Sequence, residues 1–414
     1  MFTIKNIVAA LALCCLFACN SDESKKREMA KAAITPDQYE LTTEIPKLLD
    51  RNERIWMGKE WDNVQNSYGT FAKQMRTGKE AEEAQLNMAQ LFTMEARVTG
   101  EHGHYYPASL KLIDDLLKKD LKNKDLKFRA LSIKAAVQLS QHDFKEALET
   151  GKEAVAMNPY NAQIYGVLTD AYVELGDYDM AVKMGDKMVE VRPDLRSYSR
   201  VSYLREIHGL PKDAIEAMDM AVKAGYPGYE ETAWTRLQLG QLQERYGDEK
   251  LAEYNYKRIL VERPDYPFAV AALGDLEMKR GNLEAAEKYL KDACAIIPEV
   301  GYYESLAHLY KKMGKKEEAA KLTEEIFEML QDDVDSGHNM NLEYAAVYSE
   351  LADDQVKALE YLQKEYDLRP NNIDVNLELA QVYTKMGEKN KAAKHIEAAQ
   401  KTNSKNPELL ALSK

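Results

Sequence analysis

The chain has too few cysteines for a disulfide-stabilised fold. Four cysteines occur in 414 residues, and Cys14, Cys15 and Cys19 lie close together near the N-terminus. Cys294 is alone in the rest of the chain, so no disulfide can form there. Since alanines flank it on both sides, Cys294 is predicted to be a small core residue.

Sequence motifs of catalysis are also missing. The chain has no glycine-rich phosphate loop and no Gly-x-Ser-x-Gly turn. The seven histidines fall in different segments, so we expect no shared histidine site. The close pair His102 and His104 has only Glu101 beside it, whereas a zinc site needs four ligands. We therefore predict no enzyme, no cofactor and no metal site, with a hydrolase built from scattered residues left open as an alternative.

Positive charge is scarce relative to negative charge. Against 69 acidic residues there are 56 lysines and arginines, which gives a formal net charge of -13. Nucleic-acid phosphates require a basic surface, so the composition argues against a nucleic-acid partner.

Long apolar runs are absent as well. The uncharged run Ile7–Ala18 is shorter than the roughly 20 residues that span a bilayer. It follows the positive charge of Lys5, an arrangement typical of a secretory signal. We predict that residues 1–18 are a signal peptide.

The end of this run carries a further motif. Leu16-Phe17-Ala18-Cys19 resembles the lipobox of bacterial lipoproteins, which implies cleavage before Cys19 and lipidation of its thiol. An ordinary secreted protein cut near the same place is the alternative. Residues 19–44 are polar at first and mixed in charge, as expected of a flexible tether. The resemblance implies a lipid-anchored protein of a Gram-negative outer membrane, on its periplasmic or cell-surface face, because Asn20 replaces the aspartate of an inner-membrane retention signal.

A repeat occupies most of the remaining chain. Pro193 follows Pro159 by the same interval as Pro298 follows Pro264, a period of about 34 residues. Between them a glycine is followed by alanine a few positions later, as in residues 281–286. The glycine permits the left-handed turn that ends a helix, and the proline ends the next helix. Each unit is therefore predicted to be a pair of helices.

This period and these positions resemble the tetratricopeptide repeat family. The unit from Pro267 has Leu273, Gly274, Ala286 and Pro298 at the family's offsets. The resemblance implies an all-α fold, an α-solenoid of antiparallel helix pairs wound into a superhelix. Residues 125–414 are predicted to hold about eight units, which start near residues 128, 162, 195, 233, 267, 300, 339 and 373. The seventh unit departs from the pattern, with Ala352-Asp353-Asp354 in place of glycine.

Residues 45–124 are predicted to be an irregular helical segment before the array. Apolar residues at helical spacing predict one helix pair, Lys79–Arg97 and Tyr105–Leu121, with a long joint at Thr99–His104. One or two more helices are expected within residues 45–75. A terminal unit that covers the end of a stack is often irregular.

The resemblance also implies a binding surface. In the family, the first helix of each unit lines a concave groove. Here this predicts an aromatic and apolar middle with a carboxylate rim, suited to a basic or mixed-charge segment around an apolar anchor. Trp234 and Phe268 are alternatively packed between helices as core. The predicted groove residues are Asp170, Tyr203, Glu206, Trp234, Leu237, Phe268, Asp275 and His308.

The leading hypothesis is a membrane-tethered scaffold or adaptor lipoprotein that binds a protein or peptide partner in its groove. The alternative is a cell-surface binder of glycan or another small ligand. Exposed aromatics clustered on one loop face favour the alternative, and a continuous groove favours the peptide. The sequence leaves the identity of the partner open.

Overall fold

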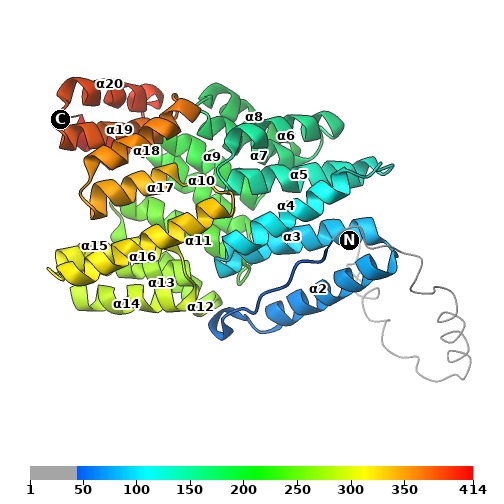
Figure 1. Cartoon of the computed structure of the whole chain (residues 1–414). Coiled ribbons are helices and arrows are strands. Elements are labelled where there is room, and N and C mark those ends of the chain that lie inside the picture. The colour runs from blue at the N-terminus through cyan, green and yellow to red at the C-terminus, as the bar shows by residue number, and fades with distance from the viewer. Residues whose placement is uncertain (1–43, 414) are drawn as a thin grey trace, which may run out of the picture.

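The fold is a stack of helix pairs wound into one superhelix (Figure 1). The computed structural model describes residues 44–413, and within this range the chain forms twenty α-helices and no strand. Helices that are neighbours in sequence pack against each other, as the α-solenoid prediction requires. That prediction is confirmed. None of the helices within residues 44–413 has the length and apolarity to cross a membrane.

The predicted array is present as eight helix pairs. Its units begin close to the predicted starts, and the first helix of each pair faces the inside of the superhelix. The pairs are α5 (Lys124–Ser140) with α6 (Phe144–Met157), α7 (Ala162–Glu174) with α8 (Tyr178–Val191), α9 (Leu195–Ile207) with α10 (Pro211–Ala224), α11 (Glu230–Arg245) with α12 (Glu249–Glu262), α13 (Pro267–Arg280) with α14 (Leu283–Ile296), α15 (Val300–Lys312) with α16 (Lys316–Asp335), α17 (Asn341–Ala346) with α18 (Gln355–Leu368), and α19 (Ile373–Lys385) with α20 (Lys389–Ala399). A short helix, α21 (Pro407–Leu412), follows the last pair.

Small residues set the distance between the two helices of a pair. Ala286 is fully buried where α14 meets α13. A Cβ atom at Gly274 would lie 2.8 Å from Leu290, so the helices approach too closely for a larger residue there. Gly281 ends α13 in the left-handed conformation with φ of 83°. The repeat pattern therefore describes packing contacts.

The seventh unit connects its two helices without a glycine. Its first helix, α17, continues as a π-helical turn over Val347–Leu351. Asp353 then adopts the left-handed conformation with φ of 54°, the role that glycine has elsewhere. An aspartate tolerates this conformation better than most residues.

The N-terminal segment differs in part from the prediction. Residues 44–58, here called the strap, contain no α-helix, only a 3-10 turn at Glu53–Ile55 and a turn at Met57 and Gly58, and a single helix follows, α2 (Lys59–Thr77). The predicted helix pair is present as α3 (Ala81–Thr99) and α4 (His102–Leu117). The predicted long joint is wrong, because His102 and His104 belong to the first turn of α4 and only two residues separate the helices.

The strap crosses from the N-terminal helices to the middle of the array (Figure 1). Arg51 pairs with the buried carboxylate of Glu95 on α3 at 2.6 Å. Arg54 pairs with Asp292 on α14 at 2.7 Å. The Asn52 amide donates to the carbonyl oxygens of Ala295 and Ile296, two of the groups that a helix C-terminus leaves without partners. The strap thus joins the start of the described chain to a unit far along the array.

The superhelix is wound so tightly that early and late repeats touch. The turn that holds Gly176 lies against Asn371, between α18 and α19. The turn that holds Gly209 lies against the backbone of Asn403, after α20. We call this line of contacts the seam. The predicted open groove is therefore enclosed on this side.

The alanine contacts predict the stability of the array. Ala286→Leu adds three carbons to a contact without free space, and overpacking of this kind costs about 1–3 kcal/mol. Lys288 is exposed on the same helix, so Lys288→Gln should change the unfolding free energy by less than about 0.5 kcal/mol. Chemical denaturation followed by circular dichroism measures both, and equal effects would disprove the packing of this pair. Lys279 is a poor control because it pairs with Glu249 at 3.0 Å.

Candidate functional site

A large cavity lies inside the superhelix. Its volume is about 960 Å³, and its walls come from α9, α11, α13, α15, α19 and α21. Six of the eight predicted groove residues line it, namely Tyr203, Glu206, Trp234, Leu237, Phe268 and Asp275.

An aromatic row crosses the wall of this cavity. Trp234, Phe268 and Tyr302 recur at the repeat period, at the same position of three successive units. Trp234 meets Phe268 edge-to-face at 5.2 Å, and Phe268 meets Tyr302 at 5.6 Å between ring centroids. Phe268 also packs against two apolar clusters of the core. The row is thus both part of the core and part of the cavity wall.

The residues of the cavity wall differ in the exposed fraction of their side chains. Trp234 is 36% exposed and Tyr203, on the neighbouring inner helix, is 37% exposed. Leu237 is 1% exposed, so it supports the wall from behind. Aromatic rings held at their edges and open on one side are suited to contact a ligand at small entropic cost.

Carboxylates dominate the charge of the cavity. Its lining contains seven acidic side chains and two basic ones. Both basic groups are already engaged: Arg245 pairs with Glu206, and Lys279 lies 3.6 Å from Glu244. No ion pair within residues 44–413 reaches the other five carboxylates, which are Asp275, Glu299, Asp374, Glu378 and Glu408.

Enclosure and crowding change the acidity of these groups. Burial raises the pKa of Asp275 to about 6, against the opposing effect of a hydrogen bond from Ser305, and the charge of Glu244 adds to the rise. Burial likewise raises the pKa of Glu378 to about 7, with Glu408 as its strongest charged neighbour. A negative charge at these positions is costly as long as no cation lies nearby.

Two predicted groove residues lie outside the cavity. Asp170 pairs with Arg200 at 2.6 Å and lines a second cavity of about 420 Å³. His308 is half-buried on α15, and burial lowers its pKa. Asp170 and His308 therefore do not line the same cavity as Trp234.

Several cavity residues were missed from the sequence. Asp374, Glu378 and Glu408 belong to the last unit and to the helix after it, and they reach the cavity because the superhelix closes. The family's inner positions in the last unit, Asp374 and Leu377, were a usable signal for this wall. The spacing of the repeats did not predict that the wall formed by α19 would face the wall formed by α11 and α13 across one cavity.

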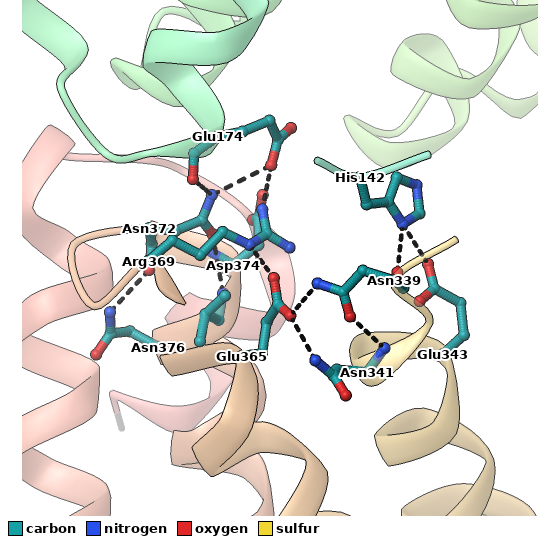
Figure 2. Close-up of polar contacts among 11 residues, drawn as sticks. His142, Glu174, Asn339, Asn341, Glu343, Glu365, Arg369, Asn372, Asp374 and Asn376 are labelled. Carbon is teal, nitrogen blue, oxygen red and sulfur yellow. Dashed lines mark hydrogen bonds and ion pairs between the residues drawn. The ribbon is translucent and has the colours of Figure 1, made fainter. Parts of the chain in front are cut away.

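The seam beside the second cavity is a polar network (Figure 2). Arg369 is 5% exposed and binds the carboxylates of Glu365, on its own helix, and Glu174, at the end of α7. The Asn372 amide donates to the backbone carbonyl of Glu174 at 3.0 Å. The backbone N–H of Ile373 donates to the Tyr178 hydroxyl at 2.8 Å. These contacts join the second unit of the array to the last one and hold the ring closed.

Three histidines, His102, His142 and His338, lie near one another where the N-terminal helices and the first repeat face the segment after α16. His102 and His338 lie 6.3 Å apart between ring centroids. His142 shares a hydrogen bond of 2.9 Å with the carbonyl of Asn339 (Figure 2). Burial, followed by the charge of His338, lowers the pKa of His102 to about 4.

Neither this cluster nor Cys294 forms a metal centre. Across residues 44–413, no group of three or more histidine, cysteine or acidic side chains is arranged to hold a metal ion. Cys294 is half-buried against the apolar cluster of α13 to α15, and burial raises the pKa of its thiol to about 12. A thiol of this kind is a poor nucleophile, since the thiolate is the reactive form.

Comparison with known proteins agrees with this architecture. One tetratricopeptide repeat profile matches residues 138–205 and 352–414, and a second matches residues 269–299 and 300–329. The chain carries tetratricopeptide repeats. An 80-residue stretch is 31% identical to small glutamine-rich tetratricopeptide repeat-containing protein 2 of Saccharomyces cerevisiae, and it covers 19% of this chain and 23% of the yeast protein.

Two solved structures are similar to this chain at low sequence identity. The hetero-tetramer Cut9–Hcn1 of the APC/C superposes with a TM-score of 0.51 at 15% identity, over 86% of this chain and 66% of that chain. PilW, described as a widely conserved type IV pilus biogenesis factor, gives a TM-score of 0.41 at 19% identity, over 48% of this chain and 92% of that chain. Tetratricopeptide repeats are scaffolds for protein–protein interaction, and these likenesses extend only to the fold.

The glycines of the seam provide a matched test of ring closure. Gly209 and Gly281 have φ of 74° and 83°, so alanine at either position costs about 1–2 kcal/mol of backbone strain. Only at Gly209 would the added methyl group overlap a neighbouring backbone, that of Asn403, whereas the space around Gly281 is free. Gly209→Ala should therefore lower the unfolding free energy by more than Gly281→Ala and raise the radius of gyration measured by small-angle X-ray scattering. Equal effects of the two substitutions would show that the seam is open in solution.

Proposed function

We propose that this chain is a membrane-tethered scaffold that holds a segment of a partner protein inside its superhelix. The observation that carries the proposal is the cavity of about 960 Å³ with Tyr203 and Trp234 partly open on its wall. Partly open rings beside a buried apolar wall match the composition of protein-binding hot spots, where aromatic side chains dominate. The position of this cavity inside the ring favours an extended segment or a chain terminus over a folded surface.

The tether is the second part of the proposal. The lipobox-like Leu16-Phe17-Ala18-Cys19 lies outside the described residues, so its support is the sequence alone. A lipid on Cys19 supplies an anchor of two or more acyl chains, which is stable because each buried methylene contributes about 0.8 kcal/mol. The protein would then present its cavity at the surface of a Gram-negative outer membrane, on the periplasmic or the external side.

The anchor is tested by one substitution. Cys19→Ala removes the thiol that carries the lipid, so the protein should move from the membrane fraction to the soluble fraction. Cys294→Ala is the matched control, because it removes a cysteine without touching the lipobox. Membrane association that survives Cys19→Ala in cells that lack the partner would disprove the lipid anchor.

A glycan or small ligand is the second candidate, and one observation favours it. Tyr226 and Tyr229 lie on the loop between α10 and α11, 76% and 68% exposed, with ring centroids 6.1 Å apart. Two exposed rings on a loop form a platform on which a sugar can stack. They lie outside the cavity lining, so the two candidate sites can be tested separately.

The aromatic residues of the cavity decide between the two candidates. We expect the double variant Tyr203→Ala/Trp234→Ala to lose recovery of the native partner by affinity purification from membranes, with only a modest drop in thermal stability. The matched control is Tyr226→Ala/Tyr229→Ala, which should keep the partner. The opposite pattern would favour the loop site, and collapse of the first variant on heating would assign Tyr203 and Trp234 to the core.

A further inference from the structure

The five unpaired carboxylates of the cavity come from two different walls. Asp275 and Glu299 belong to α13 and to the start of α15, in the fifth and sixth units. Asp374, Glu378 and Glu408 belong to α19 and α21, at the end of the chain. The two walls face one cavity because the seam closes the superhelix. The charge pattern is therefore a property of the closed ring.

The positions of three of these carboxylates are explained by the fold, and those of the other two are not. Glu299 lies at the N-cap of α15, and Asp374 and Glu408 lie in the first turns of α19 and α21. Negative charge at a helix start interacts favourably with the helix dipole, by about 0.3–1 kcal/mol. Asp275 and Glu378 lie inside their helices, where this effect has decayed. The free-energy cost of burying the charges of Asp275 and Glu378 is therefore not offset by a helix dipole.

Buried polar groups on the same wall also lack partners. Atom Oδ1 of Asp275 and the hydroxyl of Tyr302 are both buried, and neither makes a hydrogen bond to any part of the chain from residue 44 to 413. Tyr302 is 5% exposed and lines the cavity. Buried polar groups in folded proteins nearly always have hydrogen-bond partners, so Asp275 Oδ1 and the Tyr302 hydroxyl are available to bind polar groups of a ligand on this wall.

We propose that the cavity binds lysine or arginine side chains of the partner's segment between Asp275 on one wall and Glu378 on the other, with the segment's apolar residue against Trp234 and Tyr203. The inference rests on the proposed function and names the chemistry of the segment. The cationic groups of one segment can then meet carboxylates of both walls in a strongly negative space, which attracts basic segments from a distance. Glu206 and Glu244 contribute less, because Arg245 and Lys279 already pair with them.

Binding should be coupled to protons. Near pH 6.5 the free protein holds part of a proton on Asp275 and on Glu378, since their pKa values are about 6 and about 7. A bound cation stabilises the ionised forms, so the protons leave as the segment binds and affinity rises from pH 5.5 to 7.5. The other titratable groups of the cavity are Tyr203, Glu206, Glu244, Arg245, Tyr256, Lys279, Glu299, Tyr302, Asp374 and Glu408.

The test uses the full chain and a capped peptide, Lys-Lys-Leu-Lys-Lys, in isothermal titration calorimetry at low ionic strength. Titration in two buffers of different ionisation enthalpy should show proton release at pH 6.5. Asp275→Asn and Glu378→Gln should each weaken binding by about tenfold and reduce the release. Glu397→Gln, an exposed change on α20, should leave both unchanged. The two cavity variants should melt at the wild-type temperature or above it, because they remove repulsion.

Each other outcome overturns part of the proposal. No binding of the lysine peptide, or equal binding of Glu-Glu-Leu-Glu-Glu, disproves the cation site. Spermine binding as tightly as the peptide, unaffected by Tyr203→Ala/Trp234→Ala, assigns the site to a free polyamine. If the native partner is recovered by Asp275→Asn/Glu378→Gln but lost by the aromatic variant, the cation inference fails while the proposed function stands.

Discussion

Closure of the superhelix is the constraint on which the other features depend. A solenoid of helix pairs is normally held by contacts between neighbouring units alone, so its ends are independent. In this chain Arg369 reaches Glu174, and the turns at Gly176 and Gly209 lie directly against segments of the last repeats. These contacts close one side of the groove and bring the last repeats into the wall of the cavity, which stays open to solvent. They also couple early and late repeats, so the array should unfold more cooperatively than a simple stack.

The charged residues of the seam are paired with each other, whereas most carboxylates of the cavity have no ion-pair partner in the described part of the chain. At the seam, Arg369 is buried between Glu174 and Glu365, and each charge has a partner. Such a pair contributes little net stability, but loss of one partner is costly and the pair specifies a single arrangement. In the cavity, Asp275 and Glu378 have no ion-pair partner in the described part of the chain, because Arg245 and Lys279 pair with Glu206 and Glu244. The first set of charges is explained by the fold, and the second set requires a ligand.

Much of this architecture could be predicted from sequence, and the reasons are local. The regular recurrence of glycine, alanine and proline reflects contacts within one helix pair, so it predicted paired helices and the approximate starts of about eight units. Six of the eight predicted groove residues line the cavity for the same reason, because the inner face of each first helix repeats with the unit.

The remaining features depend on contacts between distant units, which no local pattern records. The enclosure of the groove, the meeting of His102 with His338 and the wall that carries Glu378 all arise from the pitch of the superhelix. That pitch is the sum of small rotations at every unit interface. The spacing of the repeats therefore did not predict that Asp170 and His308 lie outside the main cavity.

The strap determines how the molecule resists tension that is applied at the start of the described chain. A pull on the chain at residue 44 is carried first by the contacts of the strap with the N-terminal helices, such as Arg51 with Glu95 on α3, and then by Arg54 and Asn52, which hold α14. The load is therefore shared between the N-terminal helices and the middle of the array, close to the repeats that form the aromatic wall of the cavity. Several parallel polar contacts must then break together, whereas a solenoid pulled from its end loses its helices one at a time. A protein held at its N-terminus and loaded by a partner in its cavity would bear tension across this short path and leave most of the repeats unstressed.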